Sequence, residues 1–220
     1  MRYGLVVFLL LTISACVVSN KISSVTETAG QIPGRIQCEL YDSGGEGVAY
    51  HDSDSINNGS GKLNPINGNP LHEFRMGEGV DISYTKTSGV DDNRYNIVAP
   101  DSNQLYVGWT TPGEWINYTI PVMETGLYKI AIMYTANGDG GISFDIDKKH
   151  LTGELLLTST HIDKDTIAWR QWHHWNKIDS LTQVDLSKGT HQLKLHIVRN
   201  GQMNFDYLEF TRIGKSTVIK

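Results

Sequence analysis

Apolar and polar residues alternate with a period of two in several segments of this chain. In Glu114–Val122 and Leu127–Thr135 every second residue is large and apolar, and shorter runs at Ile142–Ile146 and Leu193–Ile197 repeat the pattern. Because successive side chains on a strand point to opposite faces, each segment predicts a strand with one buried face. Turn signals rich in glycine and asparagine separate the segments, at the short spacing typical of antiparallel sheets.

Helical spacing, by contrast, is not sustained over any long segment. We therefore predict an all-β fold, a β-sandwich of two antiparallel sheets with long loops at one end, and a barrel as the alternative. Two of the predicted loops are unusually long. Residues 43–76 are rich in glycine and asparagine, and residues 161–175 are rich in tryptophan and histidine. Long loops on a rigid sandwich are common places for binding.

The first 15 residues have the pattern of an export signal. Arg2 supplies a positive start, and Leu5–Ile13 supplies an apolar run too short to span a bilayer. The following Ile13-Ser14-Ala15-Cys16 resembles a bacterial lipobox, which implies that Cys16 becomes a lipidated N-terminus. The lipid would then be the only attachment to a membrane. The alternative is an ordinary cleaved signal in which the cysteine has no role.

The remaining chain divides into a tether and one domain. Residues 16–33 are rich in small polar residues without periodicity, which predicts a flexible tether. Residues 34–214 have the length of one domain with a single core. The net charge of the whole chain is −5, and no cluster of basic residues is visible, so we do not expect a nucleic-acid partner. Cys38 would be alone once Cys16 carries lipid, and its apolar surroundings predict a small buried side chain.

Three tryptophans lie close together in the second long loop. A sugar ring presents C–H groups on its face and hydroxyls on its rim, so an exposed aromatic plate with polar neighbours is suited to bind it. On a strand, Trp169 and Trp175 would share one face and Trp172 the other. We expect Trp172 in the core and Trp169 as the exposed plate. The alternative is that all three are core residues.

Seven motifs occur in a fixed order along most of the domain. They are Gln37–Asp42, Gly44–Asp52, Glu78–Ile82, Val107–Trp109, Gly113–Thr119, Trp169–Trp172 and Asn204–Tyr207. Taken together, they resemble carbohydrate-binding module family 6. The resemblance implies a jelly-roll sandwich that binds a polysaccharide or oligosaccharide among the loops at one end.

The same resemblance implies particular roles for residues. Trp169 and Phe74 would be the aromatic plates, Asn204 would bond sugar hydroxyls, and Glu46 would be a further hydroxyl partner. The family generally has tyrosine where Phe74 stands, so this chain keeps the ring at that place but not its hydroxyl.

A structural calcium ion is also implied by the resemblance, on Gln37 and Glu39 of the first strand and Asp206 of the last. Residues two apart on a strand point to the same face, so Gln37 and Glu39 can offer oxygens to one ion. Oxygen ligands without thiolates suit Ca²⁺ rather than a structural zinc ion.

Two other classes of function stay open at this point. A glycosidase needs two carboxylates across a cleft, and acids such as Glu46, Asp52, Glu78, Asp81 and Glu114 are candidates by type, but no catalytic motif marks them. An adhesive module that docks a protein on its tryptophan loop would use the same exposed aromatics. We interpret His173 and His174 as polar surface or as the rim of the sugar site. The expected setting is the bacterial outer membrane, near polysaccharide-degrading enzymes.

Overall fold

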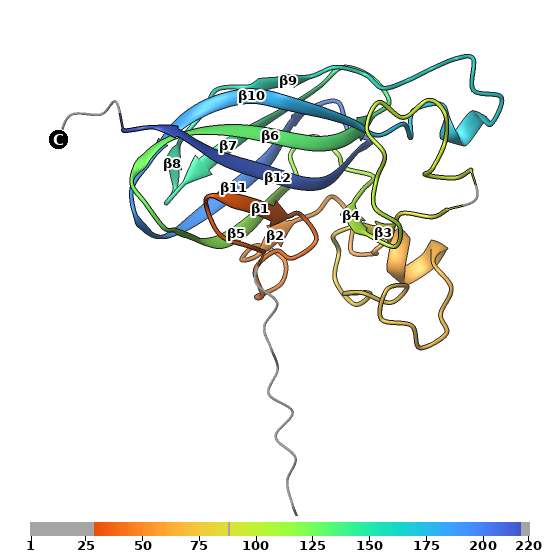
Figure 1. Cartoon of the computed structure of the whole chain (residues 1–220). Coiled ribbons are helices and arrows are strands. Elements are labelled where there is room, and N and C mark those ends of the chain that lie inside the picture. Colours follow the sequence, from red (N-terminus) through yellow and green to blue (C-terminus); the bar gives the residue numbers. More distant parts are fainter. Residues whose placement is uncertain (1–28, 88, 217–220) are drawn as a thin grey trace, which may run out of the picture.

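The computed structural model describes residues 29–87 and 89–216 and confirms the predicted all-β sandwich (Figure 1). All the paired strands run antiparallel. The first sheet holds, in spatial order, β10 (Asn176–Leu186), β6 (Gly126–Ala136), β12 (Met203–Gly214), β4 (Leu105–Val107) and β3 (Ile82–Tyr84), with β1 (Gly34–Gln37) also paired to β12. The second holds β2 (Tyr50–His51), β5 (Trp115–Val122), β11 (Gly189–Arg199), β7 (Gly140–Ile146) and β8 (Lys149–His150), with β9 (Leu155–Leu157) paired to β7.

The alternating residues form the core between the two sheets. The alternating residues of β5 are all buried, and so are those of β6; they are Ile116, Tyr118, Ile120 and Val122 on β5, and Tyr128, Ile130, Ile132 and Tyr134 on β6. Both sets belong to one hydrophobic cluster, so the inner faces of the sheets pack against each other as the period-two pattern predicted. Cys38 is free and fully buried in that cluster, which confirms its predicted place.

Long loops gather at one end of the sandwich. Figure 1 shows two short helical turns there, the π-helical η1 (Gly59–Leu63, orange) and the 3₁₀ turn η2 (Ala168–Arg170, cyan), with the yellow-green segment that follows β3 between them. Both turns interrupt the long loops that the sequence predicted. Within the described residues no helix is long and apolar enough to cross a bilayer.

The packed domain begins earlier than the predicted boundary at residue 34. Ala29 and Ile32 are buried, and the backbone N–H of Ile32 donates to the carbonyl of Pro121 on β5 at 2.9 Å. The end of the predicted tether is therefore part of the core, because burial removes the apolar side chain of Ile32 from water. Residues 1–28, which include the predicted signal segment and Cys16, lie outside the described residues.

Replacing Ile32 tests this boundary. Ile32→Ala should lower the free energy of unfolding by about 2–5 kcal/mol, since it leaves a cavity in the core. The matched control is Ile97→Ala, because Ile97 is 72% exposed and its truncation should change stability by less than about 0.5 kcal/mol. Urea denaturation of the two variants gives the comparison. Equal stability of both variants would show that residue 32 belongs to a tether.

Candidate functional site

An aromatic hollow of about 640 Å³ opens at the loop end of the sandwich. Its lining comes from η1, β3, β4, η2 and β12, and from the segments that follow the first four of these elements. The aromatic members of the lining are Tyr84, Tyr106, Trp109, Trp169 and Trp172. The volume lies within the range of small-ligand sites, and the mixture of aromatic walls with a few polar groups is typical of them.

The three tryptophans of the second long loop take different places. Trp169 lies on η2 with 56% of its surface exposed and lines the hollow, as expected for a plate. Trp172, which we expected in the core, also lines the hollow and stacks on the His173 ring with 5.7 Å between centroids. Trp175 is instead fully buried. Alternation failed here because β10 begins only at Asn176, so these residues lie on turns rather than on a strand.

A buried carboxylate holds the turn that carries Trp169. Asp165 accepts hydrogen bonds from the backbone N–H of Ile167 at 3.0 Å and from Arg170 Nε at 2.6 Å. Its Oδ2 also lies 2.9 Å from His174 Nε2. These bonds hold the pKa of the Asp165 carboxyl well below its usual range, and the bond from the Arg170 guanidinium has the largest effect. The exposed plate therefore stands on a rigid, charge-assisted support.

Two histidines differ from the sequence interpretation. Both were interpreted as polar surface or as the rim of the sugar site. His173 does line the aromatic hollow, although it is only 8% exposed, whereas His174 is 2% exposed and is not in the lining. His174 lies 3.0 Å from the carbonyl of Thr160 as well as against Asp165, and burial lowers the pKa of His173 beside Asp91. Both histidines thus fasten loops from the inside. The correction has the same cause as for Trp172, since these positions are not on a strand.

Asn204 presents a buried acceptor at the hollow. Its side chain is 2% exposed, and its Nδ2 donates to Thr135 Oγ1 on β6 at 2.9 Å. Its Oδ1 has no hydrogen-bond partner among the described residues, although the residue lines the hollow. Gly108 leaves room for this oxygen, because a Cβ there would lie 2.7 Å from it. A ligand hydroxyl can satisfy the acceptor, which otherwise costs free energy.

The other two predicted sugar contacts lie elsewhere. Phe74 is partly buried against the main core, and Glu46 is exposed with its Oε1 2.6 Å from His51 Nδ1. Neither residue is in the lining of the hollow. The structure thus brings Trp169 and Asn204 together and keeps Phe74 and Glu46 apart from them.

Most of the lining residues were missed by the sequence reasoning, and Tyr84 and Lys86 are two of them. Tyr84 lies at the end of β3, two residues after the Glu78–Ile82 motif, and Lys86 Nζ sits 4.1 Å from the centre of its ring. Lys86 Nζ also donates to Ser83 Oγ and to the carbonyl of Tyr84, both at 3.1 Å, and burial lowers its pKa. The aromatic residue just after the motif could have been noted in the sequence as a candidate for binding. The sequence did not predict, however, that β3 ends at the hollow.

The three predicted metal ligands lie where β1 leaves β12. Gln37 ends β1 and Asp206 is on β12, but Glu39, which the sequence put on the first strand, lies in the turn after β1, so strand alternation does not relate it to Gln37. The backbone N–H of Cys38 donates to the carbonyl of Asp206 at 3.0 Å, and the carboxylates of Glu39 and Asp206 both raise the pKa of the Cys38 thiol, after burial itself. Gln37 Oε1 and Asp206 Oδ2 have no hydrogen-bond partner among the described residues. Burial raises the pKa of Asp206 to about 8.

This donor set fits a hard cation. Buried oxygens from an amide and two carboxylates are what Ca²⁺ prefers, and a cation would favour the charged form of Asp206 that burial disfavours. Across the part of the chain that the structure describes, no three histidine, cysteine or acidic residues group so as to hold a metal ion. The amide oxygen of Gln37 would therefore have to take part.

Comparison with known proteins identifies a family match over more than half of the chain. Residues 81–212 match the model of the carbohydrate binding module family 6. Among similar solved structures is the C-terminal family 6 module of LamC, a marine laminarinase from Zobellia galactanivorans, with 26% identity and a TM-score of 0.38 over 49% of this chain and 80% of that one.

Two other structures have lower identity. A module of lichenase 5A from Cellvibrio mixtus, in complex with cellotriose, is 21% identical with a TM-score of 0.40 over 50% of this chain and 78% of that one. A family 6 module studied for its binding subsites is 16% identical with a TM-score of 0.44 over 81% of this chain and 93% of that one.

Replacing Asp165 tests whether it supports the turn that carries Trp169. Asp165→Asn should lower the free energy of unfolding by about 1–3 kcal/mol, since buried donors of Arg170 and His174 lose a charged acceptor. Asp163→Asn is the matched control, because the Asp163 side chain is 95% exposed. Denaturation curves of both variants check the difference. If the two variants unfold alike, Asp165 does not organise the loop.

Proposed function

This chain belongs to carbohydrate-binding module family 6, and from that premise we propose that the aromatic hollow at its loop end holds a polysaccharide or the end of its chain. A module of this family binds carbohydrate without catalysis. One observation supports placing the sugar there: an exposed tryptophan, Trp169, and a residue with a buried acceptor that has no hydrogen-bond partner among the described residues, Asn204, line the same hollow.

Stacking on the aromatic walls would supply most of the binding free energy. The C–H face of a pyranose packs on an indole, where it loses contact with water and gains dispersion contacts. Trp169 is the outer plate and Trp172 lies deeper. Tyr84 is a further aromatic member of the lining, and its ring stacks on His72. Tyr84 provides the phenolic hydroxyl that Phe74 lacks, in addition to its ring.

Polar groups at the floor would set the orientation of the sugar. Asn204 Oδ1 accepts a hydrogen bond from a hydroxyl, and the Lys86 ammonium is a donor in the same lining. Because Asn204 is held by Thr135, its oxygen does not need to be ordered when the ligand binds.

A calcium ion would stabilise the module at a distance from the sugar. Gln37, Glu39 and Asp206 are the residues that would hold it, on β12 and at the end of β1. Such an ion supplies charge that stabilises buried carboxylates, and it joins the first strand of the domain to the last.

We also propose that the protein is exported and attached to a membrane through a lipid on Cys16, and this part of the proposal rests on the sequence alone. A lipid-anchored module in a bacterial envelope would keep a polysaccharide near enzymes that degrade it.

Removing the outer plate should abolish most of the affinity. We expect Trp169→Ala to weaken glycan binding at least about tenfold, as for an aromatic anchor at the centre of an interface. Ile167→Ala is the matched control, because Ile167 precedes the same turn, is 37% exposed and does not line the hollow. A glycan array on the domain finds the ligand, and calorimetry on that ligand compares the variants. Unchanged affinity in Trp169→Ala would move the site elsewhere.

Removal of calcium should lower the melting temperature. A ligand that binds only the folded state adds about 2.7 kcal/mol of stability when its free concentration is 100 times its Kd. Chelation should therefore lower the melting temperature by several degrees, and added Ca²⁺ should restore it. Asp206→Asn should make melting insensitive to Ca²⁺, whereas Asp163→Asn should keep the response. A melting curve that does not change after confirmed metal removal would contradict the calcium proposal.

A further inference from the structure

One ammonium group lies among the walls of the aromatic hollow. Lys86 is the only lysine or arginine in the lining among the described residues, and most of the other lining side chains are apolar or aromatic. The Lys86 side chain is only partly exposed. An ammonium in such surroundings loses much of its hydration, which is costly unless other groups replace the water. The groups that replace it therefore determine what Lys86 can offer to a ligand.

The protein surrounds the Lys86 ammonium with neutral partners. Nζ donates to Ser83 Oγ and to the carbonyl of Tyr84, both at 3.1 Å, and lies 4.1 Å from the centre of the Tyr84 ring. An ammonium has three N–H donors, so these two bonds leave one donor for a ligand. Burial lowers the pKa of Lys86, and the negative charge of Asp91 opposes this shift. A negatively charged ligand group would also favour the ammonium, through a charge-assisted hydrogen bond.

The acid in the same lining is already bonded inside the protein. Asp91 is the only acidic residue in the lining among the described residues, and it is 1% exposed. Its Oδ2 accepts from the backbone N–H of Lys86 at 2.6 Å, and its Oδ1 accepts from the indole of Trp175 at 3.1 Å. The backbone N–H of Asp91 donates in turn to the carbonyl of Lys86 at 2.9 Å. Asp91 therefore fixes Lys86 in place and exposes almost no negative charge to a ligand.

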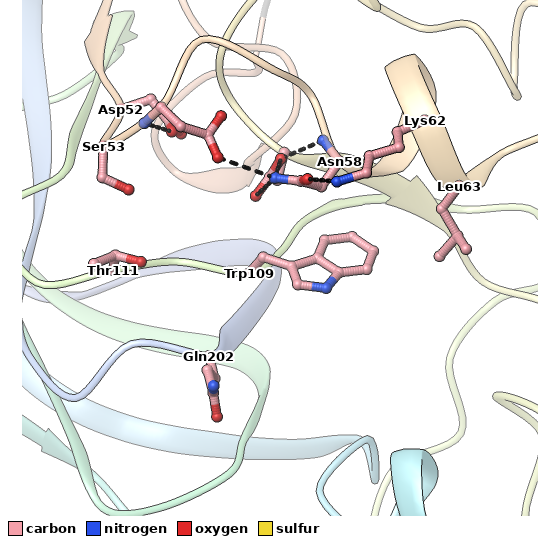
Figure 2. A pocket seen from close by; sticks show the side chains of 10 residues that line it. Asp52, Ser53, Asn58, Lys62, Leu63, Trp109, Thr111 and Gln202 are labelled. Carbon is pink, nitrogen blue, oxygen red and sulfur yellow. Dashed lines mark hydrogen bonds between the residues drawn. The ribbon is translucent and has the colours of Figure 1, made fainter.

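The adjoining hollow, by contrast, is rich in negative charge. It shares the Trp109 wall with the aromatic hollow and is lined by three carboxylates, those of Asp52, Asp54 and Asp81. Figure 2 shows that its lysine, Lys62, is directed to Asn58, with Nζ 3.2 Å from Asn58 Oδ1. These carboxylates repel an anionic group of a ligand, whereas the Lys86 ammonium attracts it. An anionic group is therefore favoured on the Lys86 side of the Trp109 wall.

We propose that Lys86 makes the aromatic hollow selective for acidic glycans, in which a carboxylate or a sulfate ester on the sugar accepts a hydrogen bond from the Lys86 ammonium. This inference rests on the proposed function of the hollow. The pyranose ring stacks on the aromatic walls as a neutral sugar would, and the anion determines which sugars are held. Uronates and sulfated sugars offer the same chemistry to Lys86, namely an oxygen with negative charge.

Matched sugars that differ only at C6 test the selectivity. The probes are trisaccharides of β-1,4-linked glucose, β-1,4-linked mannose and α-1,4-linked galactose, each in the neutral form, the uronate form and the 6-sulfated form. Calorimetry on the whole protein should show at least one acidic form that binds at least about tenfold more tightly than its neutral parent. Raising NaCl from about 50 mM to about 500 mM should narrow this difference, because salt screens charges. The two acidic forms distinguish a uronate from a sulfate as the source of the anion.

Removal of the ammonium should remove the preference. Lys86→Met keeps an aliphatic side chain without the charge, so its affinities for the acidic and neutral forms should become similar. Lys188→Met is the matched control and should keep the preference, because Lys188 is exposed in the turn between β10 and β11 and does not line the hollow. A purely structural role for Lys86 would weaken binding of neutral and acidic forms alike. Melting curves check that each variant is folded.

Failure of this inference and failure of the proposed function give different results. Neutral parents that bind at least as tightly as all their acidic forms, or a preference that Lys86→Met leaves intact, would overturn the selectivity, while loss of binding in Trp169→Ala would still support the aromatic hollow. A preference that depends on Lys86 in a protein that binds equally well without Trp169 would support the role of Lys86 and overturn the stacking on Trp169. Absence of binding to every probe would overturn both proposals.

Discussion

Strand β12 is the constraint on which both proposed binding positions depend, because it is hydrogen-bonded along both edges. β6 pairs with one edge, and β4 and β1 pair with the other. Asn204 near its start faces the aromatic hollow, and Asp206 two residues on lies beside the end of β1. A strand inside a sheet cannot move without breaking its ladders. The two polar side chains are therefore placed before any ligand arrives.

An irregularity in β12 makes this placement possible. Phe205 and Leu208 both belong to the main core although an odd offset would put them on opposite faces. The pairing of β12 with β6 shifts register between these two residues, so that Asp206 and Tyr207 fall within the irregular stretch. Such bulges redirect side chains and are frequent near functional sites. This break is one of several register shifts in the sandwich, and it lies where polar groups of the sheet meet.

The loops complete the site through buried polar anchors rather than through regular structure. Asp165 holds the turn of Trp169, and Asp91 accepts from the indole of Trp175 at 3.1 Å. Two acidic side chains that are almost completely buried thus fasten loops that are distant in sequence. Because a buried carboxylate is costly unless it is well bonded, each anchor permits few arrangements of its loop. This explains how aromatic side chains on loops can present a fixed surface to a ligand.

The sequence by itself determined the sandwich and the family to which it belongs. The alternating residues of β5 and β6 specify strands and their inner faces, because period two follows from local backbone geometry alone. Ordered motifs implied the family and predicted Trp169 and Asn204 as sugar contacts, and the structure places both residues in one hollow. Only the tertiary structure decided that Trp172 lines the hollow while Trp175 is buried, that Tyr84 and not Phe74 belongs to the lining, and that Ile32 belongs to the core. These outcomes depend on where loops end and on which distant segments pack together, and local periodicity carries no information on either.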